Sequence, residues 1–203
     1  MKNMKPASTI PRLYPSFVFM FKDDFWFSKV FIGGLVFLLS GIVVGIFLLL
    51  GYLAELTNGL LNDNETSPEW RHSDRFIAHG IRLVLAFSAY ALPLVVLNIF
   101  YHSAWLITGS IILFLFASPI TATQYAFRFS LRDCFDWKAI HHIVFLNPVL
   151  FLRNILFSYG TMALSISLGW MILIIGWPFI IFWAMLVQAH MFAALKKQSL
   201  IAL

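Results

Sequence analysis

The sequence has few charged residues for its size. Asp, Glu, Lys and Arg make up 11% of its 203 residues, whereas a soluble domain carries roughly 25%. Hydrophobic residues reach 61%, with 22 Phe and 7 Trp. A water-soluble globular protein is therefore excluded, and the composition predicts an integral membrane protein.

Cysteine is also scarce, because Cys134 is the single one in the chain. An intrachain disulfide and a CxxC redox pair are excluded as a result. Near the N-terminus, the apolar run 17–21 is too short for the core of a signal peptide, and no small-residue cleavage pattern follows it. We therefore expect no cleaved leader.

The chain lacks the residue patterns of common enzymes. It contains no HExxH, no GxSxG and no glycine-rich phosphate loop, and no Asp or Glu lies between Asp74 and Asp133 or after Asp136. Ion-coupled transport normally uses a carboxylate within the bilayer. We expect a protein that is not an enzyme and that has no catalytic residues and no metal site.

Histidine is the natural place to look for a cofactor ligand. His79 and His190 flank or enter apolar runs, so an axial bond to haem or chlorophyll is geometrically conceivable. Interfacial histidine is the simpler interpretation, and we expect no cofactor other than bound lipid. The net charge of +5 lies in clusters between apolar runs, which favours anionic lipid headgroups as partners and not nucleic acid.

Three stretches without Asp, Glu, Lys or Arg define the organisation: 30–54, 83–127 and 154–195. A helical span needs about 20 residues. The second and third stretches are twice as long, and each has a turn signal near its middle, at 98–103 and at 176–178. They predict two helical hairpins with spans near 82–100, 104–126, 154–175 and 178–195.

The fold class is thus predicted as an all-α integral membrane protein, with four transmembrane helices in two hairpins and interfacial amphipathic helices. The first apolar segment either spans the membrane or re-enters it. The expected divisions of this single membrane domain are an N-terminal arm 1–29, the first hydrophobic segment 30–54, a cytoplasmic or interfacial segment 55–81, a hairpin 82–126, a second interfacial segment 127–153, a hairpin 154–195 and a tail 196–203.

The distribution of basic residues predicts the orientation. A hairpin returns to the side that it left, so nine basic residues between 71 and 197 share one side, which the positive-inside rule places in the cytoplasm. If 30–54 spans, the five basic residues of the arm lie outside. If it re-enters, breaking at Gly33-Gly34, Ser40-Gly41 or Gly45, all fourteen are cytoplasmic. The length of this segment favours spanning, and the distribution of basic residues favours re-entry. We expect the protein to lie in a cell (plasma or inner) membrane.

A scattered set of residues resembles a known family. The set comprises Phe21-Lys22-Asp23-Asp24-Phe25-Trp26, Ile32-Gly33-Gly34, Gly51-Tyr52, Pro68-Glu69-Trp70, Phe76, Gly80, Leu92-Pro93, Phe135 and Asn147-Pro148. It resembles the uncharacterised membrane proteins of domain of unknown function family 4013, over roughly residues 17–197. Family members typically have a proline where this chain has Ser40-Gly41, and a basic residue with Gly-Glu where it has 64–67. The resemblance implies a membrane architecture and no activity.

Local patterns predict further elements at the membrane surface. Ser67-Pro68-Glu69 has the cap serine, first-turn proline and first-turn acid of a helix start, with Trp70 at headgroup depth. Gln124, Arg128 and Arg132 recur every four residues, which indicates a basic stripe that continues the 104–126 span. We expect an anionic lipid headgroup site at these two arginines together with the arginines at the starts of two other predicted spans. The four residues are Arg82, Arg128, Arg132 and Arg153. The alternative is that they only snorkel to the surface.

Small residues at interface spacing are the remaining signal. They form a GxxxG pair in the first segment and a stripe in the last hairpin, and both allow close helix approach: Gly41, Gly45, Thr161, Ser165 and Gly169. We therefore expect an accessory or scaffold subunit that assembles with other integral membrane proteins. The alternative is a permease component or lipid-handling transporter with a site between the hairpins near Arg82, Asn98 or Gln188.

Overall fold

The computed structural model describes residues 13–41, 43–101, 103–146, 148–171 and 176–201. These residues form helices and turns, with no strand among them, so the predicted all-helical fold is confirmed. Five of the described helices, namely α3, α4, α5, α7 and α8, are long and apolar enough to cross a membrane. In chain order the elements are α1 Leu13–Val18, η1 Phe19–Lys22, α2 Trp26–Leu38, η2 Leu39–Gly41, α3 Val43–Leu61, α4 Ser73–Tyr101, α5 Ala104–Arg128, η3 Leu131–Phe135, α6 Trp137–Leu146, α7 Pro148–Met171 and α8 Trp177–Ile201.

The first hydrophobic segment is not one helix over 30–54. It is broken into α2, which begins before residue 30, and α3, which ends after residue 54. The two helices pack against each other. The break lies at η2, where the Ser40 hydroxyl donates a hydrogen bond to the Phe37 carbonyl oxygen at 2.5 Å. Such a bond offers the backbone an alternative to continued α-helix. With 13 residues, α2 is about 20 Å long, which is shorter than the roughly 30 Å hydrocarbon core.

The two predicted hairpins correspond to α4 with α5 and to α7 with α8. The α4 helix ends at Tyr101, within the turn predicted at 98–103, and α5 begins directly after this turn at Ala104. In the second hairpin α7 ends at Met171 and α8 begins at Trp177, and residues 172–175 lie outside the described residues. Three predicted bounds are corrected by several residues: α4 begins at Ser73 and not at 82, α7 begins at Pro148 and not at 154, and α8 continues to Ile201 and not to 195.

The helix start predicted at Ser67-Pro68 is wrong, because α4 begins at Ser73. The preceding helix, α3, ends in a left-handed cap: Asp63 has φ 62°, and the Asn64 N–H donates to the Gly59 carbonyl at 2.9 Å. The chain then runs as a loop from 62 to 72, whose backbone groups bind the start of α2 instead of opening a helix.

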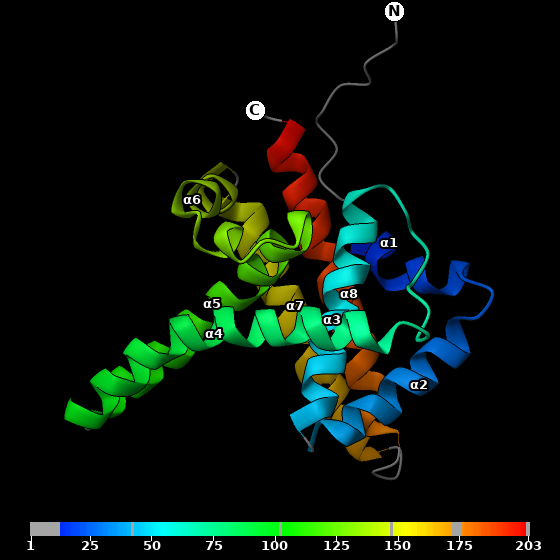
Figure 1. Cartoon of the computed structure of the whole chain (residues 1–203), viewed down its shortest axis with the longest axis horizontal. Helices are drawn as coiled ribbons and strands as arrows, with labels where there is room; N and C mark the ends of the chain where they lie inside the picture. Colours follow the sequence, from blue (N-terminus) through cyan, green and yellow to red (C-terminus); the bar gives the residue numbers. More distant parts are fainter. Residues whose placement is uncertain (1–12, 42, 102, 147, 172–175, 202–203) are drawn as a thin grey trace, which may run out of the picture.

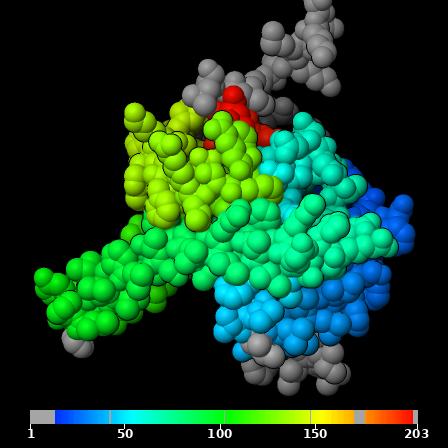
Figure 2. Space-filling view, in the orientation of Figure 1, coloured from blue at the N-terminus to red at the C-terminus, as the bar shows by residue number. Residues whose placement is uncertain are grey.

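The outer halves of α4 and α5 form an arm. In Figure 1 these two helices leave the body together, and in Figure 2 they stand clear of the rest of the surface. The body contains α2, α3, α7 and α8, with α4 crossing α3. Its largest core cluster is built around Tyr52 of α3, Phe76 of α4 and Phe182 of α8.

The charged segments between the apolar helices lie next to one another. Lys22 bonds Glu65, which ties η1 to the 62–72 loop, and Lys197 at the end of α8 pairs with Asp63. Asn58 of α3 donates from Nδ2 to the Ala126 carbonyl near the end of α5, at 2.7 Å. The ends of α3, α5 and α8 therefore meet the start of α2.

Candidate functional site

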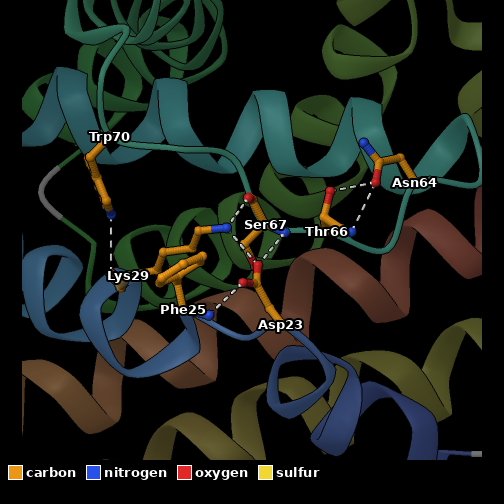
Figure 3. A network of polar contacts seen from close by, with 7 residues as sticks. All are labelled: Asp23, Phe25, Lys29, Asn64, Thr66, Ser67 and Trp70. Carbon is orange, nitrogen blue, oxygen red and sulfur yellow. Dashed lines mark hydrogen bonds and ion pairs between the residues drawn. The ribbon is translucent and has the colours of Figure 1, made fainter.

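A partly buried polar network joins the 62–72 loop to the start of α2 (Figure 3). Lys29 Nζ donates to Asp23 Oδ2 and to the Ser67 carbonyl oxygen, both at 2.6 Å. The Asp23 carboxylate also accepts from the Ser67 N–H at 3.2 Å and from the Phe25 N–H at 3.0 Å. The exposed fractions of the Lys29 and Asp23 side chains are 13% and 7%, so this is a largely buried ion pair with its hydrogen bonds satisfied within the network.

Trp70 holds the same loop from the apolar side. Its ring stacks on Tyr52, with centroids 4.1 Å apart and planes 12° apart, and its indole N–H donates to the Lys29 carbonyl oxygen at 3.1 Å. The ring is half-buried and packs against the core cluster of α3 and α8. The prediction that Trp70 begins a helix as a surface anchor is therefore corrected: its ring and its N–H both bind other segments of this chain.

Two glycines allow α3 and α4 to touch through their backbones. A Cβ atom on Gly51 would lie 1.8 Å from the Phe76 carbonyl oxygen, and one on Gly80 would lie 1.9 Å from the Phe47 carbonyl oxygen. Only glycine fits such an approach. The residues Gly51-Tyr52 and Trp70, which were singled out in the sequence, thus converge on one junction, and Gly51 and Gly80 allow α3 and α4 to cross there.

Beside this junction lies a polar cavity of about 920 Å³. Its walls come from the η1–α2 connection, the loop after α3, the end of α3 and the start of α4. The charged lining residues are three cations and four carboxylates: Lys22, Lys29, Arg75, Asp23, Asp24, Glu55 and Glu69. The sequence did not predict this cavity, because the segments that form its walls lie far apart in the chain. The residues that resemble the family were the only sequence signal in these segments.

The inner wall of the cavity is tied to α5. His79 Nδ1 lies 2.7 Å from the Tyr125 hydroxyl, and its ring packs on Phe129 with centroids 4.1 Å apart. Phe129 has φ 52° and terminates α5 in the left-handed region. Together with the Asn58 bond to α5, these contacts fix three walls of the cavity relative to one another.

The Asp23–Lys29 pair also sets the charge state of the cavity wall. Burial tends to raise the pKa of Asp23, but the hydrogen bonds from Lys29 and Phe25 and the charge of Lys29 lower it, and the result lies below the ordinary value of 3.8. The hydrogen bond from Lys22 likewise lowers the pKa of Glu65. Both carboxylates are therefore ionised at neutral pH.

The junction and the cavity lie largely within a recognised family region. Residues 34–110 match a family model. The model is described as protein of unknown function, DUF4013. The resemblance found in the sequence is confirmed over this stretch, which is shorter than the range 17–197 expected from the scattered motif. No curated protein and no solved structure matches the chain.

The DUF4013 match brings no activity with it, and the predicted arginines lie on four separate elements. Arg82 lies on α4, Arg128 ends α5, and Arg153 lies half-buried on α7. The predicted stripe of Gln124, Arg128 and Arg132 is wrong, because the left-handed Phe129 ends α5 and Arg132 belongs to η3. A lipid site at these four arginines stays a prediction.

The predicted small residues mostly pack within the chain. A Cβ on Gly45 would lie 2.4 Å from the Leu39 carbonyl, and one on Gly169 would lie 2.4 Å from the Trp177 ring. Thr161 and Ser165 are buried on α7, the helix that packs on α8. Gly41 alone has open space around it. The break at η2 places Gly41 and Gly45 on different elements, so they do not form a GxxxG face.

The two histidines considered as cofactor ligands both contact neighbouring elements. His79 bonds Tyr125 as described, and His190 Nδ1 lies 2.9 Å from the Ser16 hydroxyl while its ring stacks on Phe19. Over the part of the chain that the structure describes, no group of three or more His, Cys, Asp or Glu residues is placed to hold a metal ion. The expectation of no cofactor stays a prediction.

Proposed function

We propose that this is a multi-pass protein of the plasma or inner membrane, with its charged segments in the cytoplasm. The five long apolar helices support insertion, and the meeting of the charged segments supports a common side for them. In the proposed topology α4, α5, α7 and α8 span, and the first hydrophobic segment re-enters, so that α3 returns to the side on which α2 begins. The network from Asp23 and Lys29 to Ser67 supports this, because it joins the start of α2 to the loop after α3. All fourteen basic residues then lie on one side.

The proposed role is that of a non-enzymatic accessory or scaffold subunit that assembles with other integral membrane proteins. The observation that carries it is the α4–α5 arm. Only 11% of the most apolar stretch of α4 is buried, against 56% for α8. The chain therefore builds a long apolar surface that it does not cover itself. In a membrane this surface is available to lipid or to the helices of a partner protein.

Polar groups in the arm favour a protein partner over lipid alone. Asn98 Nδ2 donates to the Ser110 hydroxyl at 3.2 Å, and both residues line an apolar cleft of about 240 Å³ between α4 and α5. Gly109, on the same helix as Ser110, has nothing within 4 Å of its Cβ position. Membrane helices associate through small residues and hydrogen-bonding side chains, whereas lipid acyl chains form no hydrogen bonds with them.

The alternative, a permease component or lipid-handling transporter, has less support. The cavity between the hairpins, which Gln188 lines, has a volume of about 70 Å³. Ligand pockets usually have volumes of about 300–1,000 Å³. This space is therefore too small for a lipid or a drug-sized solute.

Site-specific photo-crosslinking in membranes tests the subunit proposal. We expect a crosslinker at Val96 or Ile112, both exposed on the arm, to capture one discrete protein. Leu164, exposed on α7, is the matched control position and should give lipid adducts only. Gly109→Leu should abolish the arm adduct while leaving the thermal unfolding midpoint unchanged. Lipid adducts alone at all three positions would refute the proposal.

Cysteine labelling tests the re-entrant topology. In a Cys134→Ser background, Ser28→Cys and Asn62→Cys flank the first hydrophobic segment. Re-entry predicts that an impermeant reagent modifies both from the same side of sealed vesicles. Modification from opposite sides would show that this segment spans.

A further inference from the structure

Most charges that line the polar cavity are already bound to other charges. Lys29 pairs with Asp23 inside the wall. Lys22 pairs with Glu65, and Glu69 lies 3.3 Å from Arg71, so each is held by a residue outside the lining. Among the described residues, three lining charges have no ion pair within 4.0 Å, namely Asp24, Glu55 and Arg75, and Glu55 and Arg75 attract each other over a longer distance.

These three charges have the composition of a zwitterion receptor. Two carboxylates and one guanidinium favour a ligand with an ammonium group next to an anionic group. A bare phosphate would meet more negative than positive charge there. Glu55 matters most because it is half-buried, and a carboxylate withdrawn from water gains most from a hydrogen-bonding cation.

We propose that this cavity binds a phosphoethanolamine group, with the primary ammonium at Glu55 and Asp24 and the phosphate at Arg75. A guanidinium binds phosphate through two parallel hydrogen bonds. A primary ammonium donates hydrogen bonds to carboxylates, which the quaternary ammonium of choline cannot do. The volume of about 920 Å³ lies within the usual range of small-molecule sites.

The location fits a phospholipid headgroup as the source of this group. The cavity lies where α3 ends and α4 begins, next to the charged loops that the proposed topology places at the membrane surface. The Asp23–Lys29–Ser67 network and the Asn58 bond hold its walls in place before a ligand arrives. This inference rests on the membrane insertion proposed above, and free phosphoethanolamine has the same chemistry.

Lipid retention measured by native mass spectrometry tests the proposal. The purified chain in nanodiscs with equal phosphatidylethanolamine, phosphatidylcholine and phosphatidylglycerol should retain the ethanolamine lipid preferentially. Glu55→Gln should reduce this preference about tenfold, as expected for loss of a charge-assisted hydrogen bond. Asp63→Asn is the control, because Asp63 is an exposed carboxylate whose ion-pair partner Lys197 also lies outside the lining, and it should change nothing.

Asp24→Asn and Arg75→Gln provide a second test that does not disturb the interior, because both residues are exposed. Each should weaken retention of the ethanolamine lipid, and Arg75→Gln should also weaken binding of free phosphoethanolamine in detergent, measured by calorimetry. Binding of the free compound without lipid retention would identify a soluble source.

Equal retention of all three lipids together with no calorimetric binding, or unchanged retention in Glu55→Gln, Asp24→Asn and Arg75→Gln, would overturn the proposal. Extraction of the protein from membranes by alkaline carbonate would instead refute the insertion on which it rests. The two failures are thus distinguishable.

Discussion

Gly51 of α3 lies directly against the carbonyl oxygen of Phe76 of α4, so that a Cβ atom on Gly51 would approach this oxygen to 1.8 Å. Gly80 of α4 meets the Phe47 carbonyl of α3 in the same way. The contact is reciprocal, and each helix supplies one glycine and one carbonyl. This crossing directs α4 away from the body and so fixes where the arm projects.

Enlarging either glycine should separate the two helices. Gly51→Ala and Gly80→Ala each add a methyl group that overlaps a backbone carbonyl oxygen of the other helix. We therefore expect each to lower the free energy of unfolding by at least about 2 kcal/mol. Denaturant unfolding in detergent measures it. Gly109→Ala is the control, because its Cβ would meet open space, and it should be neutral or stabilise by up to about 1 kcal/mol. Equal effects at all three positions would contradict this account of the crossing.

The two contributions of Trp70 can be separated by substitution. Trp70→Phe retains an aromatic ring on Tyr52 but loses the N–H that bonds the Lys29 carbonyl oxygen, which should cost about 1 kcal/mol. Trp70→Ala also loses the ring and should cost about 3 kcal/mol or more. Thermal unfolding in detergent gives the order. If Phe were as destabilising as Ala, the indole bond and not the stacking would hold the loop.

Acid should weaken the network around Asp23. Because the folded pKa of Asp23 lies below the ordinary value of 3.8, its contribution to stability is complete above that value and is lost as the pH falls through the folded pKa. We expect the stability difference between the natural protein and Asp23→Asn to be constant at neutral pH and to shrink below about pH 4. Unfolding midpoints across this range measure it.

The neighbouring carboxylate provides the comparison for that experiment. Asp24 is exposed and has no ion pair within 4.0 Å among the described residues. Asp24→Asn should therefore change stability little at any pH. A pH dependence that is the same in Asp23→Asn and in the natural protein would assign the acid sensitivity to other groups.

The long apolar runs made most of the helices predictable. A run of 45 residues without Asp, Glu, Lys or Arg, from 83 to 127, is too long for one span. The interruption expected at 98–103 lies where α4 gives way to α5. The break at Ser40-Gly41 was one of several positions that glycine and serine made possible. The sequence alone did not distinguish among them.

The failures occurred where tertiary contacts override local preference. Ser67 has the residue pattern of a helix cap, but its N–H and its carbonyl are bound by Asp23 and Lys29 from 38 or more residues away. The arginine stripe failed at one residue, because Phe129 is left-handed and interrupts the four-residue spacing. The polar cavity has walls from distant segments, and no local pattern encodes it.

A lysine, Lys196, is buried near the end of α8. Lys196 Nζ donates to Gln124 Oε1 at 3.0 Å and lies 5.1 Å from the centroid of the Phe127 ring, and Lys196 and Gln124 are both almost fully buried. Gln124→Leu removes the acceptor and leaves a buried ammonium, which should cost about 2–3 kcal/mol. Lys196→Met leaves only a neutral amide unpaired and should cost about 1 kcal/mol.

The double variant separates this pair from general disruption. With both partners replaced by apolar groups, no unpaired charge remains, so Gln124→Leu with Lys196→Met should be more stable than Gln124→Leu alone. Chemical unfolding of the four proteins in one detergent completes the cycle. Strictly additive losses would mean that Lys196 and Gln124 act independently. The ties from α8 to α5 would then have to come from the apolar contacts around them.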